Sequence, residues 1–304
     1  VVNPGGTSLL IHNFVFFWAT EWLFFLLEVV SLLAYYYTYR LSREGAMPPE
    51  THKRIGLVYA VAGFLSLVLI NGIITFMLSA GQGPASGSVW RAFFNPGFLP
   101  GTLYRLAMSL ILAGMFALFT ASRIRSEYAK RLAIRSGALW IVFPFFLLLA
   151  TSFQYFAVLP PDRQAAILRR TADIHPFLKA YGWILCVVFL GGVQAFIRAE
   201  RLRRPLSVLI LCTGLMLVGS FEWIREAGRR PWIVEGLMYS NGISIAQAVQ
   251  AQAKGAASQS GWLRLLDTML EPDAEGSLPA HSVPLDDGLT RGALLFAQQC
   301  HACH

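Results

Sequence analysis

The sequence contains little charge. Only 14% of its 304 residues are Asp, Glu, Lys or Arg, whereas soluble domains average about 25%. Hydrophobic residues make up 55% of the chain, and the mean hydropathy is +0.52. These values exclude an ordinary soluble enzyme and indicate a membrane protein. The formal net charge of +8 does not indicate nucleic-acid binding, because the arginines gather between apolar runs and no basic segment is interleaved with aromatic residues.

Several other features are absent. The chain has no evident cleavable signal peptide, no internal repeat, and no low-complexity segment before residue 245. It begins with Val1 rather than Met, so we expect a processed or incomplete start. Cysteine is scarce: of four cysteines, Cys186 and Cys212 lie within apolar runs and are expected to be small packing residues.

Six apolar runs are long enough to cross a bilayer, which takes about 20 residues each. They fall near 13–38, 55–80, 102–122, 133–158, 177–198 and 205–224. Short polar loops separate them, and a helix satisfies its own backbone hydrogen bonds in lipid. The sequence therefore predicts an all-α fold, a polytopic bundle of six transmembrane helices.

Basic residues are distributed unequally among the five loops between these runs. The first, third and fifth loops hold thirteen Lys and Arg residues, and the second and fourth hold four. Because cytoplasmic loops carry the excess of positive charge, the odd-numbered loops are expected in the cytoplasm. Both termini are then expected on the periplasmic side of a bacterial inner membrane. His52 falls in the first loop and is expected to be solvated.

The chain ends in AQQCHACH, in which Cys300, Cys303 and His304 form C-x-x-C-H, the attachment pattern of a c-type haem. Two thiols on one helical turn reach the two vinyl groups of a single porphyrin. The adjacent histidine is placed to ligate the iron, so His304 is the predicted metal ligand. Covalent haem attachment takes place on the periplasmic side, which agrees with the orientation taken from the loops.

The composition changes after the sixth run. Residues 1–232 form the predicted membrane domain, residues 233–285 a periplasmic surface segment and linker, and residues 286–304 the start of a small cytochrome c domain. The stretch GISIAQAVQAQAKGAASQ fits either a surface helix or a loop. The sequence offers no second axial ligand, so either the natural chain continues past His304 or another subunit completes the haem site.

Two acidic residues lie inside the first apolar run. Glu21 and Glu28 are seven residues apart, which places them on one face of a helix, roughly 10 Å apart along its axis. Ionisable groups within membrane spans are costly and usually functional. One interpretation is that each carboxyl is protonated or paired with an arginine of a neighbouring helix. The other interpretation is a haem edge or a proton path.

Further charges gather near the outer ends of two other runs. Arg105 lies near the start of the third run, where it either snorkels to the interface or pairs with a carboxylate or a haem propionate. The end of the sixth run crowds together five charged residues: Glu222, Arg225, Glu226, Arg229 and Arg230. This end of the bundle is a candidate support for a membrane haem or a proton route.

The sixth run continues into REAGRRPW, which resembles a segment in subunit I of cytochrome bd-type quinol oxidases. The family pattern is Glu-x-Gly-Arg-Gln-Pro-Trp; here Glu226 begins it and Arg230 replaces the Gln. TEWLFFLLEVVS is similar to the family's third helix with its glutamate pair, LINGIITF to its Ala-Asn-Gly helix, and NPGFLPGTLYRLAMSLILAGMF to its fifth helix. The resemblance covers about residues 14–240 and the family's helices three to eight, and it implies an oxidoreductase subunit.

The resemblance also implies roles for single residues. Glu226 matches a carboxylate that ligates a high-spin haem b, and Glu21 matches an acid beside the oxygen-reducing haem. Tyr104 stands where the family has a histidine ligand of a low-spin haem b, and Leu178 lies near the position of its methionine partner. That haem is therefore expected to be absent. PPDRQAAI falls where the family's quinol-binding loop begins, and the corresponding loop is short here, which argues against quinol oxidation.

Together these features predict a membrane electron-transfer subunit of a respiratory complex. It would pass electrons between a periplasmic c-type haem and a membrane or quinone-linked partner. The expected cofactors are covalent haem c and a haem b or d shared with a partner subunit. The residues expected to support the membrane haem or proton route are Glu21, Glu28, Arg105, Glu226 and Arg229.

The family's first two helices have no counterpart here, so one partner subunit is expected to supply two further transmembrane helices. A periplasmic cytochrome c or multihaem subunit is a further expected partner, and so is quinone. Two alternatives remain open: a terminal quinol or cytochrome c oxidase subunit with b or d haems, and a haem-free membrane scaffold that tethers a cytochrome c domain.

Overall fold

The structure is a computed structural model that describes residues 4–83, 87–168, 174–230, 232–234, 236–240 and 243–254. The chain divides into two units, Phe14–Arg230 and Val1–Asn13 with Pro231–His304. Each unit is described by itself. The predicted haem c residues Cys300, Cys303 and His304 lie outside the described residues.

The unit Phe14–Arg230 contains six long helices among its described residues, and each is long and apolar enough to cross a membrane. They are α2 (Val15–Arg43), α3 (Pro49–Phe76), α6 (Phe98–Ala121), α7 (Glu127–Ala157), α9 (His175–Ile197) and α10 (Arg204–Ala227). Proline in the first turn begins three of them, and the Ser126 hydroxyl accepts a hydrogen bond from the Ala129 backbone N–H at the start of α7. The prediction of an all-α bundle with six spans is confirmed.

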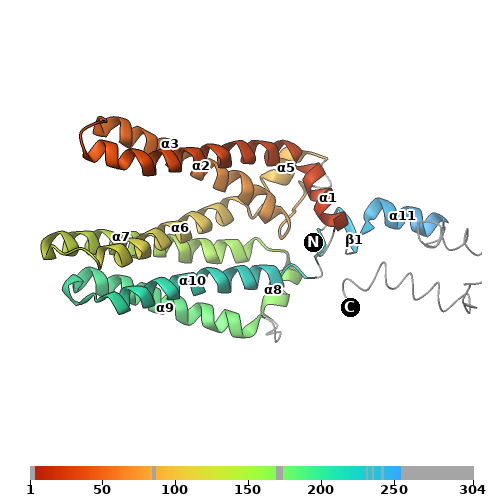
Figure 1. Ribbon diagram of the computed structural model, residues 1–304. Helices are drawn as coiled ribbons and strands as arrows, with labels where there is room; N and C mark the ends of the chain where they lie inside the picture. Colours follow the sequence, from red (N-terminus) through yellow and green to blue (C-terminus); the bar gives the residue numbers. More distant parts are fainter. Residues whose placement is uncertain are drawn as a thin grey trace, which may run out of the picture. The chain divides into compact units, whose positions relative to one another are not determined.

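The six helices pack as three hairpins of consecutive helices: α2 with α3, α6 with α7, and α9 with α10 (Figure 1). Helix α3 connects the first hairpin to α6, while α9 packs on α7 and α10 packs on α6. Most side chains of α2 are exposed, among them Trp22, Leu23, Leu26 and Tyr36. An apolar exposed surface of this kind suits contact with lipid or with another membrane helix.

Two short helices fill what the sequence presents as polar loops. Helix α5 (Val89–Phe93) begins where the Ser88 hydroxyl accepts a hydrogen bond from the Arg91 backbone N–H. The ring of Phe93 on α5 stacks on Phe17 of α2, with centroids 3.9 Å apart. Helix α8 (Pro161–Leu168) lies between α7 and α9. Both add apolar surface at the ends of the long helices.

The most extensive helix–helix contact among the described residues lies between α6 and α7. Ile111, Leu118, Ile134 and Ile141 are fully buried in the core that these two helices share with α9 and α10. Gly114 of α6 faces α7 so closely that an added Cβ would lie 2.6 Å from the Gly137 carbonyl oxygen. Small residues at such crossings let membrane helices approach, because packing rather than hydrophobicity holds them together.

This contact predicts opposite outcomes for two glycine substitutions. Gly114→Ala should destabilise the protein by about 2 kcal/mol, because the Gly137 carbonyl must move to admit the methyl group. Gly219→Ala on α10 has open space around it and should change stability by less than about 1 kcal/mol. Thermal unfolding of the detergent-solubilised protein measures both. Equal unfolding temperatures for the two variants would show that the α6–α7 contact is looser than described.

The second unit contains helix α1 (Pro4–Asn13), strands β1 (Met238–Ser240) and β2 (Ile243–Ser244), and helix α11 (Ile245–Lys254). The strands pair antiparallel, with Met238 opposite Ser244 and Ser240 opposite Ile243. The segment that fitted either a surface helix or a loop is helical over Ile245–Lys254.

Two sequence expectations about single residues are wrong. Cys186 and Cys212 are exposed on α9 and α10 rather than packed. In a run that is apolar throughout, the sequence does not indicate which residues face outward. His52 is buried, with 9% of its surface exposed. Its ring stacks on Tyr35 at 4.3 Å, and its Nδ1 lies 3.0 Å from the Thr38 hydroxyl, so α3 carries it into the contact with α2.

Candidate functional site

The two acidic residues of α2 both face α3. The Ser66 hydroxyl of α3 donates a hydrogen bond to Glu21 Oε1 over 3.1 Å. Two turns further along α2, a Cβ on Gly63 would lie 3.1 Å from Glu28 Oε1, so the glycine leaves room for this carboxyl. The prediction that Glu21 and Glu28 share a face is confirmed. Among the described residues neither carboxyl pairs with an arginine.

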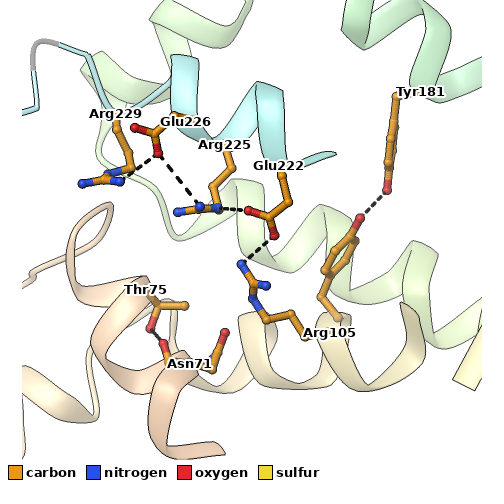
Figure 2. Close-up of polar contacts among 9 residues, drawn as sticks. Asn71, Thr75, Arg105, Tyr181, Glu222, Arg225, Glu226 and Arg229 are labelled. Carbon is orange, nitrogen blue, oxygen red and sulfur yellow. Dashed lines mark hydrogen bonds and ion pairs between the residues drawn. The ribbon is translucent and has the colours of Figure 1, made fainter. Parts of the chain in front are cut away.

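A network of ion pairs joins the end of α10 to α6 (Figure 2). Glu222 bridges two arginines: its Oε1 lies 2.9 Å from Arg105 Nη2, and its Oε2 accepts a hydrogen bond from Arg225 Nε over 2.7 Å. One turn on, Arg229 Nη1 donates to Glu226 Oε2 over 2.8 Å. The spacing of three and four residues puts these groups on one side of α10. We call these five residues the arginine–glutamate cluster.

The arginine–glutamate cluster carries more positive than negative charge, with three arginines and two glutamates. Arg225 is the most buried of its ion-paired side chains, with 14% exposed. Its Nη1 is buried without a hydrogen-bond partner among the described residues. Arg229 also reaches the residue that follows α3, since its Nη2 lies 3.1 Å from Met77 Sδ. The cluster can therefore accept a further anionic or hydrogen-bond-accepting group.

A buried arginine that the sequence places in a loop closes the end of α10. Arg163 of α8 donates from Nη1 to the carbonyl oxygens of Gly228 and Arg230, over 3.3 and 2.6 Å. These carbonyls follow the last turn of the helix, where a basic side chain satisfies unpaired acceptors. Arg163 therefore holds the backbone between Gly228 and Arg230. Nothing in its local sequence separates it from the exposed loop arginines.

Polar side chains also connect α3 to α6. Asn71 donates from Nδ2 to the Thr102 hydroxyl over 2.8 Å and to the Phe98 carbonyl over 3.1 Å. Figure 2 shows Asn71 with Thr75, whose hydroxyl donates to the Asn71 carbonyl over 2.8 Å. Asn71 Oδ1 is buried and has no partner among the described residues. The Ala-Asn-Gly resemblance thus falls on an interhelical hydrogen-bonding position.

An apolar cavity of about 380 Å³ lies beside the arginine–glutamate cluster, between α6, α7, α8, α9 and α10. Its lining includes Tyr104, Phe153, Leu178, Tyr181, Phe221 and Arg225. The Tyr104 and Tyr181 hydroxyls are hydrogen-bonded to each other over 2.9 Å, and the Tyr104 ring stacks on Phe221 with centroids 4.1 Å apart. We call this space the α6–α10 cavity.

The α6–α10 cavity does not fit a low-spin haem b. Tyr104 stands where the resemblance places the family's histidine ligand, and Leu178 lies near the position of its methionine ligand. Both residues line the cavity. No histidine, methionine or cysteine is among its lining residues, and the two phenols are bonded to each other. The described residues also hold no group of three or more His, Cys, Asp or Glu side chains able to bind a metal ion.

The predicted site residues fall into two described groups. Arg105, Glu226 and Arg229 lie together in the arginine–glutamate cluster, while Glu21 and Glu28 lie on the α2–α3 hairpin. The cluster suits a haem in part. The Glu226 side chain is half exposed, and its carboxylate is a group that can ligate iron. Arginines are suitable partners for the haem propionates. Sequence reasoning missed the cavity, the tyrosine pair and the burial of Arg163.

Comparison with known proteins supports the fold. No protein-family model and no curated protein matches this sequence. Among solved structures, the bd oxidase from Geobacillus thermodenitrificans is similar, with a TM-score of 0.64 and 14% sequence identity. The match covers 97% of this chain and 80% of that chain. This likeness and the six membrane-length helices show an all-α, multi-pass membrane fold like that of a bd oxidase chain.

Proposed function

We propose that this chain, with the fold of a bd oxidase chain, is a membrane electron-transfer subunit of a respiratory complex. It passes electrons between a periplasmic c-type haem and a membrane or quinone-linked partner. The observation that carries the proposal is the combination of this fold with a C-x-x-C-H motif at the end of the chain. A bundle of this kind alone does not specify electron transfer.

The electron-carrying group in this proposal is covalent haem c, which supplies one-electron redox chemistry when bound. Cys300 and Cys303 anchor it and His304 ligates the iron. The excess of basic residues in the odd-numbered loops supports a periplasmic position for this tail. The membrane bundle anchors the tail at the surface, within reach of a periplasmic cytochrome c or multihaem subunit.

The described residues have two tasks in the membrane. In the arginine–glutamate cluster, Glu226 is the candidate ligand for a haem b or d shared with a partner subunit, and Arg105 and Arg229 supply positive charge for its propionates. On the α2–α3 hairpin, Glu21 holds or releases a proton next to the Ser66 hydroxyl. Glu28 is a second carboxyl on the same face of α2 and continues this proton route. The exposed apolar side of α2 supports contact with a partner subunit that supplies two further spans.

Optical spectroscopy of the purified intact complex tests the proposal. The pyridine haemochrome spectrum should contain haem c, and haem staining after denaturing electrophoresis should mark this chain. Abundant non-covalent haem b or d together with oxygen reduction would favour the terminal-oxidase alternative. A complex in which this chain carries no covalent haem would overturn the proposal.

Two substitutions separate electron transfer from a purely structural role. Glu21→Gln and Glu226→Gln should each slow electron transfer between haem c and the membrane partner by roughly tenfold or more, since each removes a group that holds a proton or ligates iron. Glu50→Gln is the control, because Glu50 pairs with Lys53 on an exposed turn. Stopped-flow reoxidation of haem c gives the rates. Unchanged rates in both variants would indicate the haem-free scaffold.

A further inference from the structure

We infer that the α6–α10 cavity binds one acyl chain of an anionic membrane phospholipid, with the lipid phosphate held at Arg225. This site is distinct from the haem c tail, and the inference does not depend on electron transfer by this chain.

The cavity has the size and chemistry of a hydrocarbon site. Its volume of about 380 Å³ lies in the range of ligand pockets, roughly 300–1,000 Å³. Apart from the tyrosine hydroxyls, Ser152 and Arg225, the side chains that line it are apolar. Water is a poor occupant of such a space, because a buried water molecule needs several polar partners. Hydrocarbon fills it without loss of hydrogen bonds.

The cavity is reached from the side of the bundle that faces the membrane. Phe153 of α7 is 75% exposed and Leu168 of α8 is 60% exposed, and both line the cavity. Phe153 belongs to a membrane-spanning helix, so its exposed surface lies against lipid. An acyl chain can therefore enter laterally from the bilayer, without crossing the polar surface of the protein.

The polar end of the cavity favours an anion. Arg225 lines the cavity, and its Nη1 is buried without a partner among the described residues. The arginine–glutamate cluster that contains it has one more arginine than glutamate. Excess positive charge and an unsatisfied N–H are both costly near a membrane, and a phosphate oxygen relieves both. The cavity lies beside the last turns of α7 and α10, close to the depth at which lipid headgroups begin.

Other occupants satisfy these features less well. A haem finds no histidine, methionine or cysteine among the lining residues, and the Tyr104 and Tyr181 phenols are hydrogen-bonded to each other. A neutral carbonyl compound such as a quinone accepts a hydrogen bond from Arg225 but leaves the excess charge uncompensated. A free fatty acid shares the chemistry of an anion on a hydrocarbon chain, and its mass distinguishes it from a phospholipid.

The test is native mass spectrometry of the intact complex in mild detergent, with bound lipids identified by fragmentation. The wild-type complex should retain an anionic phospholipid such as phosphatidylglycerol. Leu178→Trp places an indole ring in part of the cavity and should reduce retention strongly, because an acyl chain then lacks room. Arg225→Gln should reduce retention about tenfold, the loss expected for one charge-assisted hydrogen bond. It leaves Glu222 paired with Arg105.

Matched controls keep the test decisive. Leu190→Trp adds the same side chain to the exposed side of α9, and Arg91→Gln removes an exposed arginine on α5; both lie outside the cavity lining and should retain the lipid. Gel filtration and thermal unfolding identify any variant that fails to fold. In that case, phosphatidylglycerol and phosphatidylcholine are added together to the wild-type complex, and the lipid retained is measured. Phosphatidylglycerol should be retained in preference to phosphatidylcholine.

Several results would overturn the inference. They are retention of zwitterionic lipid as readily as anionic lipid, no retained phospholipid at all, and equal retention by Leu178→Trp and Leu190→Trp. A quinone, fatty acid or non-covalent haem that is lost from Leu178→Trp but not from Leu190→Trp would also overturn it, because that molecule would then be the occupant of the cavity. Haem staining of the same samples is read separately, so failure of this inference is distinguishable from failure of the proposed function.

Discussion

Replacing both Cys300 and Cys303 by serine is expected to remove covalent haem from this chain completely. Serine cannot form the thioether bonds that join the porphyrin vinyl groups to the protein, so the heme-staining band at the mass of the chain should disappear. His304→Ala should retain the covalent haem and shift its absorption spectrum, because only the iron ligand is lost. Haem staining and reduced-minus-oxidised spectra of membranes measure both effects.

Cys186 and Cys212 provide the matched control for this prediction. Both are exposed on membrane-spanning helices and neither belongs to the C-x-x-C-H motif. Their replacement by serine should leave the haem-staining band unchanged. A band that survives the double substitution at Cys300 and Cys303 would show that the attachment interpretation of the motif is wrong.

Loss of the Arg105 guanidinium should destabilise the membrane bundle by about 1–2 kcal/mol, less than for a fully buried pair because Glu222 keeps Arg225 as a partner. Arg105→Leu leaves Glu222 with one arginine in place of two, in a site where only 34% of the glutamate side chain is exposed. Glu222→Gln removes both of its ion pairs and should cost a similar amount. The double variant Arg105→Leu with Glu222→Leu should recover part of the loss, since it leaves neither member of this pair alone. Thermal and denaturant unfolding in detergent give these values.

The exposed pair of Arg40 and Glu44 is the control for this second prediction. Its side chains are 82% and 54% exposed, so Arg40→Gln should cost less than about 1 kcal/mol. If Arg105→Leu and Arg40→Gln are equally mild, the arginine–glutamate cluster is solvated and does not stabilise the bundle.

The six spans are predictable from the sequence because length and hydropathy are local properties of a helix. α3 begins at Pro49 rather than near 55 and α7 at Glu127 rather than near 133, since polar residues that border an apolar run still join its first turns. The shared face of Glu21 and Glu28 follows from helical periodicity, and their contact with α3 follows from the short connection between the two helices.

Features that depend on contacts between distant segments are not predictable in this way. The hydrogen bond between Tyr104 and Tyr181 joins α6 to α9, and Arg163 reaches backbone more than 60 residues away, at Gly228. His52 reads as a loop residue until Tyr35 and Thr38 are placed against it. The α6–α10 cavity is formed by five helices, and no single stretch of sequence signals a space between them.

The pairing of consecutive helices into three hairpins has a consequence for biosynthesis. The two helices of each pair can contact each other as soon as the second helix leaves the ribosome, so the contacts within a pair are available before the next pair is made. The ion pair between Arg105 of α6 and Glu222 of α10, by contrast, can form only after the last hairpin has been inserted. Insertion can then proceed pair by pair, and the charged contact between the second and third pairs acts as a late step that completes assembly.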